Sequence, residues 1–292
     1  MFQFTNPQRE ALESNDKNLR IIACAGSGKT STIAGKVAYL LNPKNGLNVF
    51  PKNIIAFTYT DKAAAELKNK ILKFIKEDDD LKEIKGIADM YIGTIHGWCL
   101  KALQENEYKY QKFSVLNDIK LRLFVDKNYS KIGMTDITKN NIPPTPPGPP
   151  MKIFVDTGRF IQVMNIIRES ELTRPLPENI QTAKEKYESI LQSNCYFDFT
   201  MIMTEAIDRL DDKKELYNKI KQDLRYLIVD EYQDINPIQE QLIEKLYETG
   251  KPVLTVVGDD DQNIYQWRGS NNQFIKNFIN KYSPAIEKKI RR

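Results

Sequence analysis

Four apolar runs divide the chain, and each of them ends in a short polar segment. The runs are continuous rather than alternating, which is typical of strands in a parallel sheet that is covered on both faces. Ligands of such sheets bind at the carboxyl ends of the strands, so we expect the polar segments to meet there. The runs are Leu19–Cys24, Asn53–Thr60, Tyr226–Val229 and Pro252–Val257, with Tyr91–Ile95 as a weaker fifth.

Helical patterns lie between these predicted strands. After each of the first two runs, apolar residues recur at i, i+4, i+7 and i+8, the spacing of an amphipathic helix. The alternation of strands and helices predicts a doubly wound α/β fold with a parallel sheet. The apolar positions are Ile33, Val37, Leu40 and Leu41 in the first helix and Leu67, Ile71, Phe74 and Ile75 in the second.

The strand signal disappears between about Gln104 and Asn218. We interpret residues 104–218 as an all-α insertion subdomain that interrupts an α/β domain made of residues 1–103 and 219–292. The helical patterns that support this are Ile119–Val125, Phe160–Ile167 and Ile202–Leu210.

Two segments do not fit either pattern. Residues 143–150 read PPTPPGPP, and proline at this density excludes a helix or a central strand. We interpret this stretch as a stiff, exposed spacer, with a ligand for a proline-recognising domain as the alternative. The basic tail, Glu287–Arg292, is interpreted as either a helix or a cut end.

Composition narrows the class of protein. Of the 292 residues 41% are apolar and 28% are charged, which is typical of a soluble globular protein and excludes disorder of the whole chain. No apolar stretch approaches the ~20 residues of a membrane span. The net charge of +4 is too small to indicate a nucleic-acid partner. Three scattered cysteines fit neither a disulfide framework nor a zinc site, which favours a reducing compartment; they are Cys24, Cys99 and Cys195.

Residues 23–30, ACAGSGKT, follow the first predicted strand and precede the first long helix. In a P-loop, small residues let backbone N–H groups close around phosphate oxygens at a helix N-terminus. Lys29 would then reach the β- and γ-phosphates, and the Thr30 hydroxyl would bind Mg²⁺. Ala23 stands where the strict pattern has glycine. The alternative is a structural glycine-rich turn.

A P-loop needs an acidic partner, and the run Tyr226–Val229 ends in one. Asp230 would hold Mg²⁺ through water, and Glu231 would polarise the attacking water. The alternative is a solvated acidic turn. The long separation between Lys29 and Asp230 is unusual for a small-molecule kinase and agrees with an insertion between them.

With both halves in place, the chain resembles the UvrD/Rep/PcrA family of superfamily 1 DNA helicases. Six motifs occur in the family's order, which makes the resemblance specific. It implies a RecA-like P-loop NTPase domain and, for the parent protein, an ATP-dependent single-stranded-DNA translocase with 3′ to 5′ polarity. The motifs are FTNPQREA at 4–11, ACAGSGKT at 23–30, FTYTDKAA at 57–64, GTIH at 93–96, DEYQD at 230–234 and VGDDDQNIYQWRG at 257–269.

The resemblance also implies the roles of individual residues for ATP and Mg²⁺. Gln8 corresponds to the adenine reader, Gln262 to the sensor of the γ-phosphate, and Gln233 to a link between the hydrolysis site and its surroundings. Lys29, Asp230, Glu231 and Gln262 would carry catalysis, and Thr30 and Asp230 would hold the metal. The nucleotide-binding set is Gln8, Ala25, Gly26, Ser27, Gly28, Lys29, Thr30, Ser31 and Arg268.

Single-stranded DNA, or a junction of single and double strands, is the implied partner. Aromatic side chains suit it because stacking on a base contributes ~1–3 kcal/mol and tolerates any sequence. The alternative for Tyr59 and Trp267 is that they are ordinary core residues. The alternative for His96 is a structural role. We do not interpret Asp259–Asp261 as a second metal site, because consecutive side chains at a strand end point in different directions. The implied DNA contacts are Tyr59, Thr60, Thr94, His96, Tyr265 and Trp267.

The chain also departs from the family pattern. Ser31 stands where many relatives carry an arginine that packs on adenine, and Asp61 replaces an asparagine. The motifs that relatives carry on a second RecA-like domain do not occur in these 292 residues. Because that domain supplies arginines worth ~10³–10⁵ in turnover, we expect this chain alone to bind nucleotide weakly and hydrolyse it slowly.

Several expectations and alternatives follow. The second RecA-like domain is the expected intramolecular partner, and we expect a monomer in the cytoplasm, associated with the nucleoid in a prokaryote. One alternative is a nucleotide-gated module that binds single strands without productive turnover, and another is the motor part of a helicase–nuclease. In a small-molecule kinase, the DEYQD and DQNIYQWRG segments would have no role.

Overall fold

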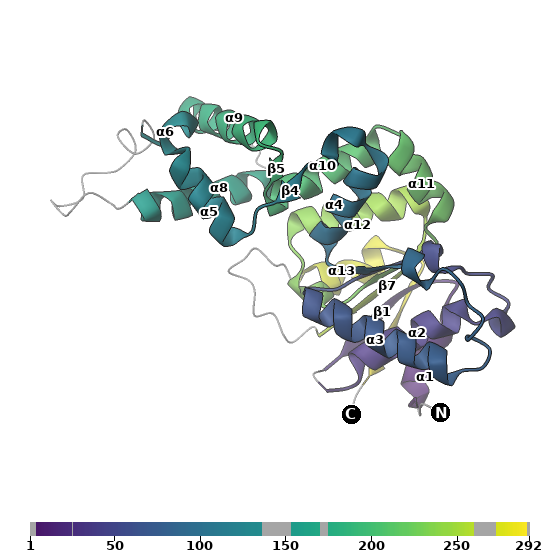
Figure 1. Ribbon diagram of the computed structural model, residues 1–292. Coiled ribbons are helices and arrows are strands. Elements are labelled where there is room, and N and C mark those ends of the chain that lie inside the picture. The colour runs from purple at the N-terminus through teal and green to yellow at the C-terminus, as the bar shows by residue number, and fades with distance from the viewer. Residues whose placement is uncertain (1–3, 25, 136–152, 170–174, 260–272, 291–292) are drawn as a thin grey trace. The chain divides into compact units, whose positions relative to one another are not determined.

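A computed structural model describes residues 4–24, 26–135, 153–169, 175–259 and 273–290 (Figure 1). The chain forms two compact units, one of Met1–Trp98 with Ile207–Arg292 and the other of Cys99–Ala206. The divisions between the units fall inside two helices, α4 (Ile95–Asn106) and α10 (Phe199–Asp211). Residues 143–150 lie outside the described part of the chain.

The first unit is built on a six-stranded sheet in which each neighbouring pair is parallel, as predicted. The strand order is β3-β2-β6-β7-β1-β8. All five predicted runs are strands, although some end earlier than the apolar pattern does. Thr60, for example, is excluded from β2 because its hydroxyl accepts the Ala63 N–H and caps the next helix. The strands are β1 (Asn18–Ala23), β2 (Ile54–Phe57), β3 (Tyr91–Gly93), β6 (Tyr226–Val229), β7 (Val253–Gly258) and β8 (Ala285–Ile290).

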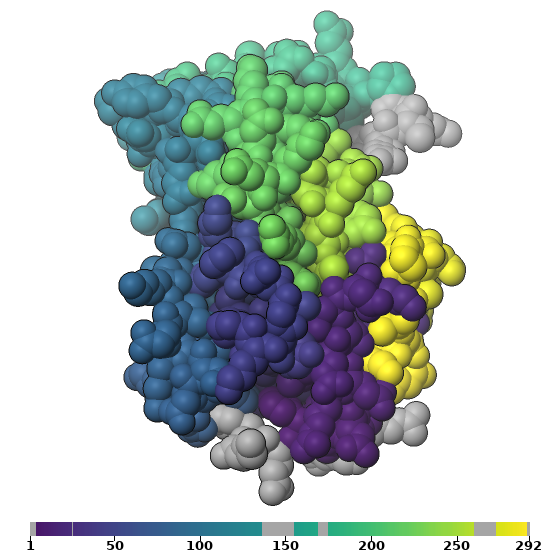
Figure 2. All heavy atoms as spheres, turned by 90° about the vertical axis from the view of Figure 1, so that its right-hand side faces the viewer, coloured from purple at the N-terminus to yellow at the C-terminus, as the bar shows by residue number. Residues whose placement is uncertain are grey.

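The interpretation of the basic tail as a helix is wrong for residues 287–290, which belong to β8. This strand pairs with β1 along its whole length, and Arg20 of β1 forms an ion pair with Glu287. Figure 2 shows the N-terminal and C-terminal segments of this unit side by side. The apolar positions Ile286 and Ile290 are four apart, a helical spacing, but pairing with a strand far away in sequence decides the conformation. Charged side chains are typical of such an edge strand.

Helices cover both faces of the sheet (Figure 1). On one face lie α1 (Asn6–Glu13), α2 (Lys29–Leu41) and α3 (Asp61–Glu77), and on the other lie α12 (Pro237–Gly250) and α13 (Gln273–Lys281), with α11 (Glu215–Asp223) packed against α12. The apolar positions predicted for α2 and α3 are all buried in one core with the strands. Full burial of each such side chain contributes ~1.5–3 kcal/mol.

The second unit is mainly helical. The predicted helices over Ile119–Val125 and Phe160–Ile167 are confirmed as α5 (Asp118–Lys127) and α8 (Ile153–Glu169), and α6 (Tyr129–Ile132) and α9 (Glu178–Ser193) accompany them. The all-α prediction misses one parallel pair, β4 (Ser114–Val115) with β5 (Tyr196–Phe197). Strands of two residues carry no readable periodicity.

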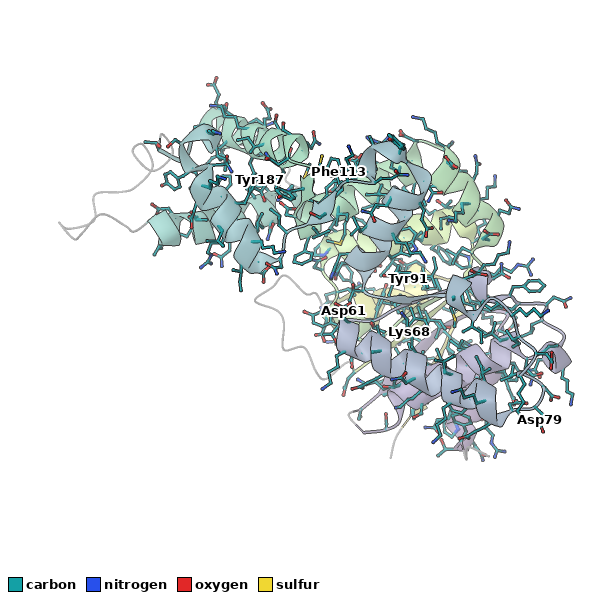
Figure 3. All side chains as sticks on the ribbon, viewed as in Figure 1. Asp61, Lys68, Asp79, Tyr91, Phe113 and Tyr187 are labelled. Atoms are coloured by element: carbon teal, nitrogen blue, oxygen red, sulfur yellow. The ribbon has the colours of Figure 1, made fainter. Side chains whose placement is uncertain are left out.

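A buried carboxylate organises this second unit. Asp198 is 1% exposed and accepts from both Nη atoms of Arg168, at 3.1 and 2.7 Å, from the Tyr187 hydroxyl at 2.5 Å and from the Met201 N–H at 2.7 Å. Figure 3 labels Tyr187 among these helices. Four donors satisfy a charge that would otherwise be costly to bury.

Over the described ranges of the whole chain, no helix is long and apolar enough to span a membrane.

Short 3₁₀ turns complete the fold. Some of them precede strands and others follow helices, whereas Tyr232–Asp234, in the DEYQD segment, lies between β6 and α12. The others are Pro43–Asn45, Pro51–Asn53, Ile87–Asp89 and Tyr108–Tyr110.

Candidate nucleotide-binding site

The predicted polar segments meet at the carboxyl edge of the sheet. β6, β7 and β1 are consecutive in the sheet, so the acidic pair after β6, Asp259 after β7 and the loop after β1 lie in a row. The loop passes into α2 through Gly28, which has a left-handed φ of 89° and directly precedes the first helical residue, Lys29. The free backbone N–H groups at the start of α2 suit an anion.

Lys29 and Glu231 form an ion pair across this edge. Lys29 Nζ lies 2.9 Å from Glu231 Oε2, and the two side chains are only 15% and 32% exposed. Glu231 has a φ of 51°, which is uncommon for a residue with a side chain and turns the chain sharply after β6. Residues that are 202 positions apart in sequence are thereby joined.

Gln233 connects the ends of β6 and β7. Its side chain is 3% exposed; Nε2 donates to Glu231 Oε2 at 2.8 Å, and Oε1 accepts the Asp259 N–H at 3.1 Å. Gly258 makes room for it, because a Cβ at this position would overlap Gln233 Oε1. Glu231 is therefore held by Gln233 as well as by Lys29.

The electrostatics of the site favour a cation. Burial, followed by the charge of Glu231, raises the pKa of Asp230 to about 7, although Lys29 opposes the shift. The same causes raise the pKa of Asp234 to about 6. A positive charge beside these carboxyl groups opposes both shifts, as Lys29 already does.

Gln8 lies against the loop. It is 9% exposed; its Nε2 donates to Ser27 O at 3.2 Å, and its Oε1 accepts the Thr5 N–H at 2.9 Å. An amide has two N–H donors and two lone pairs, so one of each is left over. That remaining pair has the pattern with which glutamine binds the edge of adenine. Ser27 Oγ is also buried, with no hydrogen-bond partner among the described residues.

The loop before α2 and the first turn of α2 carry the remaining described residues of the predicted nucleotide set. Thr30 and Ser31 are half-buried, and Gly26 is exposed. Lys70 Nζ of α3 lies 3.4 Å from Ser31 Oγ. Sequence reasoning missed Lys70, because nothing in the α3 pattern indicates which helix its charged face approaches.

The segments after β2 and β3, which carry the described DNA candidates, run side by side. The Thr58 N–H donates to Gly93 O at 2.9 Å. Tyr59 is half-buried and Thr60 is exposed. Tyr59 is thus neither a core residue nor a fully exposed one, and the Thr60 hydroxyl already caps α3.

Thr94 and His96 interact with each other. Thr94 Oγ1 lies 3.3 Å from His96 Nε2 and accepts the Gly97 N–H at 3.3 Å. Burial lowers the pKa of His96, while the charge of Asp61 opposes the shift. Figure 3 labels Asp61 at the start of α3 and Tyr91 on β3. His96 is half-buried. Because its pKa is lowered, its imidazole is mainly neutral at physiological pH.

Several predicted site residues lie outside the described part of the chain, and the structure does not place them. Their positions fall in the loop itself and in the segment after β7. Among the residues that are described, no group of three or more His, Cys, Asp or Glu side chains is arranged to hold a metal ion. The residues outside are Ala25, Gln262, Tyr265, Trp267 and Arg268, together with Asp260 and Asp261.

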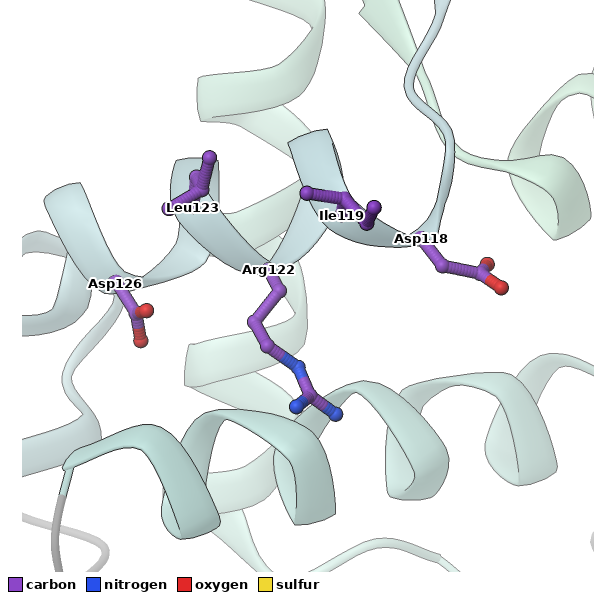
Figure 4. Close-up of a pocket in the computed structure, with 5 residues that line it drawn as sticks. All are labelled: Asp118, Ile119, Arg122, Leu123 and Asp126. Atoms are coloured by element: carbon purple, nitrogen blue, oxygen red, sulfur yellow. The ribbon is translucent and has the colours of Figure 1, made fainter.

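A separate hollow lies on the second unit (Figure 4). The described residues that line it all belong to α5, where Ile119 is 74% and Leu123 is 62% exposed. The helix turns Leu121 and Val125 inward instead. Its described lining residues include none of the predicted site residues; they are Asp118, Ile119, Arg122, Leu123 and Asp126.

Comparison with known proteins agrees with these motifs. Residues 4–283 match the family model described as the UvrD/REP helicase N-terminal domain. A Mycoplasma capricolum protein named "Probable DNA helicase II homolog" is 31% identical over 290 residues, which cover 98% of this chain and 38% of that protein. The "Probable DNA helicase" of Mycoplasma pneumoniae is 32% identical over 97% of this chain and 51% of its own length.

The "ATP-dependent DNA helicase PcrA" of Staphylococcus aureus is 30% identical over 284 residues, which cover 95% of this chain and 36% of the relative. The chain thus spans between about a third and a half of the curated relatives that it matches. Since the family model covers nearly the whole chain, and the P-loop and acidic segments lie where its fold requires them, this protein belongs to the UvrD/REP helicase N-terminal domain family.

Proposed function

We propose that this chain is the ATP-binding part of an ATP-dependent DNA helicase that moves along single-stranded DNA, with 3′ to 5′ polarity. The observation that carries the proposal is the 2.9 Å contact between Lys29 Nζ and Glu231 Oε2. It joins a phosphate-binding lysine to a carboxylate of the kind that orients an attacking water.

The residues fit ATP with Mg²⁺. Gln8 has a free donor and acceptor for adenine, and Ser27 Oγ is buried without a partner among the described residues, next to the free N–H groups of the α2 N-terminus. Thr30 and Asp230 would hold the metal. When bound, Mg²⁺ neutralises negative charge on the transferring phosphoryl group.

Glu231 and Lys29 would separate when ATP binds. Lys29 would leave the carboxylate for the β- and γ-phosphates, and Glu231 would then accept a hydrogen bond from the attacking water. Gln233, which holds Glu231 Oε2 at 2.8 Å, would keep the carboxylate oriented during this exchange. Stabilisation of charge and alignment of the water account for most catalysis of phosphoryl transfer.

DNA binding is proposed for the segments after β2 and β3. Tyr59 offers a partly exposed ring for base stacking, and Thr60 an exposed threonine for backbone phosphate. Both segments leave the same sheet edge as the nucleotide site, one or two strands away from β6. A nucleotide-dependent movement of this edge would therefore reach the strand-binding segments.

Steady-state ATP hydrolysis by the 292-residue chain, with and without oligo-dT, tests the proposal. Turnover that rises with oligo-dT and is lost in both Lys29→Ala and Glu231→Gln supports a hydrolysing motor domain. Lys29-dependent binding without turnover supports the narrower role of a nucleotide-gated module that binds single strands. The absence of both turnover and Lys29-dependent binding would contradict the proposal for this chain.

A further inference from the structure

Lys36 is a lysine in the interior of the first unit, outside the residues assigned to the nucleotide. It lies on α2, about two turns after the P-loop, and is 1% exposed. Its Nζ lies 3.0 Å from Ala11 O, 2.6 Å from Ser14 O and 3.3 Å from Asn15 Oδ1. All three acceptors belong to the last turn of α1 and the residues directly after it.

The chemistry of this contact matches a helix C-terminus. Carbonyl groups in the last turn have no partner within their own helix, and their partial negative charge attracts a cation. Lys36 supplies three N–H donors when it is protonated, one for each oxygen. Burial lowers its pKa to about 7, so the ammonium form depends on these three neutral acceptors. The contact therefore fastens Lys36 specifically to the end of α1.

The opposite end of α1 is fastened to the P-loop. There Gln8, in the first turn, donates to Ser27 O at 3.2 Å. Between the two ends, Gly35 lets the helices approach closely, because a Cβ at this position would lie 2.5 Å from Phe4 Cζ and 3.2 Å from Leu12 Cδ2. α1 thus lies along α2 with a polar attachment at each end, and these attachments set where the Gln8 amide stands relative to the loop.

We propose that Lys36 is a positioning residue for recognition of the nucleotide base, acting by holding α1 so that the Gln8 amide is presented beside the P-loop. This inference rests on the proposed function, in which Gln8 reads adenine. The hydrogen bonds of the Lys36 side chain go to the end of α1 and not to the phosphate-binding residues, so it affects the choice of base rather than the binding of the triphosphate.

This role has a signature that general destabilisation lacks. Lys36→Met keeps most of the length of the side chain but removes every donor, so α1 loses its attachment and Gln8 loses its fixed position. The variant should bind GTP about as well as the wild-type chain does, while its preference for ATP over GTP falls about fivefold to tenfold, the effect of losing roughly one or two neutral hydrogen bonds. Lys36→Arg restores donors and should restore the preference.

The experiment is an equilibrium titration of the 292-residue chain with fluorescent mant-ATP and mant-GTP in the presence of Mg²⁺. Wild type, Gln8→Ala, Lys36→Met and Lys36→Arg are compared. Leu246→Ala, a core lesion on the opposite face of the sheet, serves as a control for loss of stability. We expect Gln8→Ala and Lys36→Met to lose the preference for ATP together, and Lys36→Arg and Leu246→Ala to keep it.

The outcomes separate this inference from the proposed function. Wild type that binds neither nucleotide contradicts both. Two results overturn the positioning role alone. In the first, the preference for ATP depends on Gln8 but survives in Lys36→Met. In the second, Lys36→Met weakens the affinity for ATP and for GTP equally. If Lys36→Met fails to fold, the positioning role is tested instead by amide hydrogen exchange of the Lys36→Gln variant. Faster exchange confined to α1 supports the role, and equal loss of protection in α1 and α2 contradicts it.

Discussion

Lys29 Nζ and Glu231 Oε2 lie 2.9 Å apart and join the start of α2 to the end of β6. Under the proposed function, Lys29 would bind phosphate and Glu231 would orient water, and here the two side chains form an ion pair. ATP would then have to break this pair, and part of its binding free energy would be used to prepare the site for hydrolysis. Removal of the carboxylate charge should therefore strengthen nucleotide binding while it weakens chemistry.

Gly258 and Gln233 give a test of the packing behind Glu231. Because a Cβ at Gly258 would overlap Gln233 Oε1, Gly258→Ala should lower the free energy of unfolding by about 1–3 kcal/mol. The penalty should shrink in a Gln233→Ala background, where the nearer of two overlapping atoms is absent and only Ile275 Cδ1, at 2.7 Å, remains. Chemical denaturation of the four proteins measures this coupling. An equal penalty in both backgrounds would place the clash elsewhere.

Asp230 should make stability depend on pH. Burial and Glu231 raise the pKa of Asp230 to about 7, whereas an unfolded aspartate titrates near ~3.9. Between these values the unfolded chain releases a proton that the folded chain retains, so stability falls as pH rises. Asp230→Asn removes this dependence.

The thermal midpoint of Asp230→Asn, without nucleotide, should therefore exceed that of wild type by an amount that grows between about pH 5 and about pH 7 and then levels off. The measurement is a pair of thermal melts across this range. A difference that is constant with pH, or that shrinks as pH rises, would contradict the shift assigned to Asp230.

Tyr232, the central residue of the DEYQD segment, has a structural role. It is fully buried and donates to Glu240 Oε2 at 2.6 Å, while Tyr282 donates to Glu240 Oε1 at 2.9 Å. Burial raises the pKa of Glu240, and these donors oppose the shift. Tyr232→Phe and Tyr282→Phe should each cost about 1–3 kcal/mol of unfolding free energy, because a buried carboxylate loses a donor.

The matched control for these two variants is Tyr108→Phe, at a tyrosine that is 84% exposed, where no change is expected. Denaturation of the three variants by urea compares them directly. If the two buried substitutions were as neutral as the exposed one, the hydroxyl contacts with Glu240 would contribute nothing to stability.

Arg168 should be essential to the second unit. Its side chain is 6% exposed and that of its partner Asp198 is 1% exposed, so Arg168→Met would leave a buried charge without its cation. Such a loss costs about 3–5 kcal/mol. The double variant Arg168→Met with Asp198→Asn should recover part of it. Thermal unfolding monitored by circular dichroism checks the order, and a double variant no more stable than Arg168→Met would argue against a charge penalty.

The sequence predicts the sheet well where its signal is local. Continuous apolar runs such as Tyr226–Val229 are strands in the structure, because such runs suit a sheet that is buried on both faces. The helical spacing that begins at Ile33 is buried as expected. β8 is missed because its pairing with β1 joins residues far apart in sequence, and the exposure of Ile119 and Leu123 depends on how α5 is turned.

In the candidate site, too, the local motifs can be predicted from the sequence and the long-range contacts cannot. The loop at 23–30 and the acidic pair after β6 can be predicted, because phosphate binding requires small residues and a lysine at fixed spacing. The buried polar residues that support them cannot. Lys36 takes its acceptors from residues 21–25 positions earlier, and Tyr232 depends on Glu240, whose burial no local pattern indicates.

The most direct test is the affinity of the 292-residue chain for mant-ATP with Mg²⁺ in wild type, Lys29→Ala and Glu231→Gln. We predict that Lys29→Ala loses binding, whereas Glu231→Gln, which frees Lys29 from its partner, binds about fivefold more tightly than wild type, the effect of removing an ion pair worth ~1 kcal/mol. Undiminished binding in Lys29→Ala would contradict the assignment of this edge of the sheet as the nucleotide site.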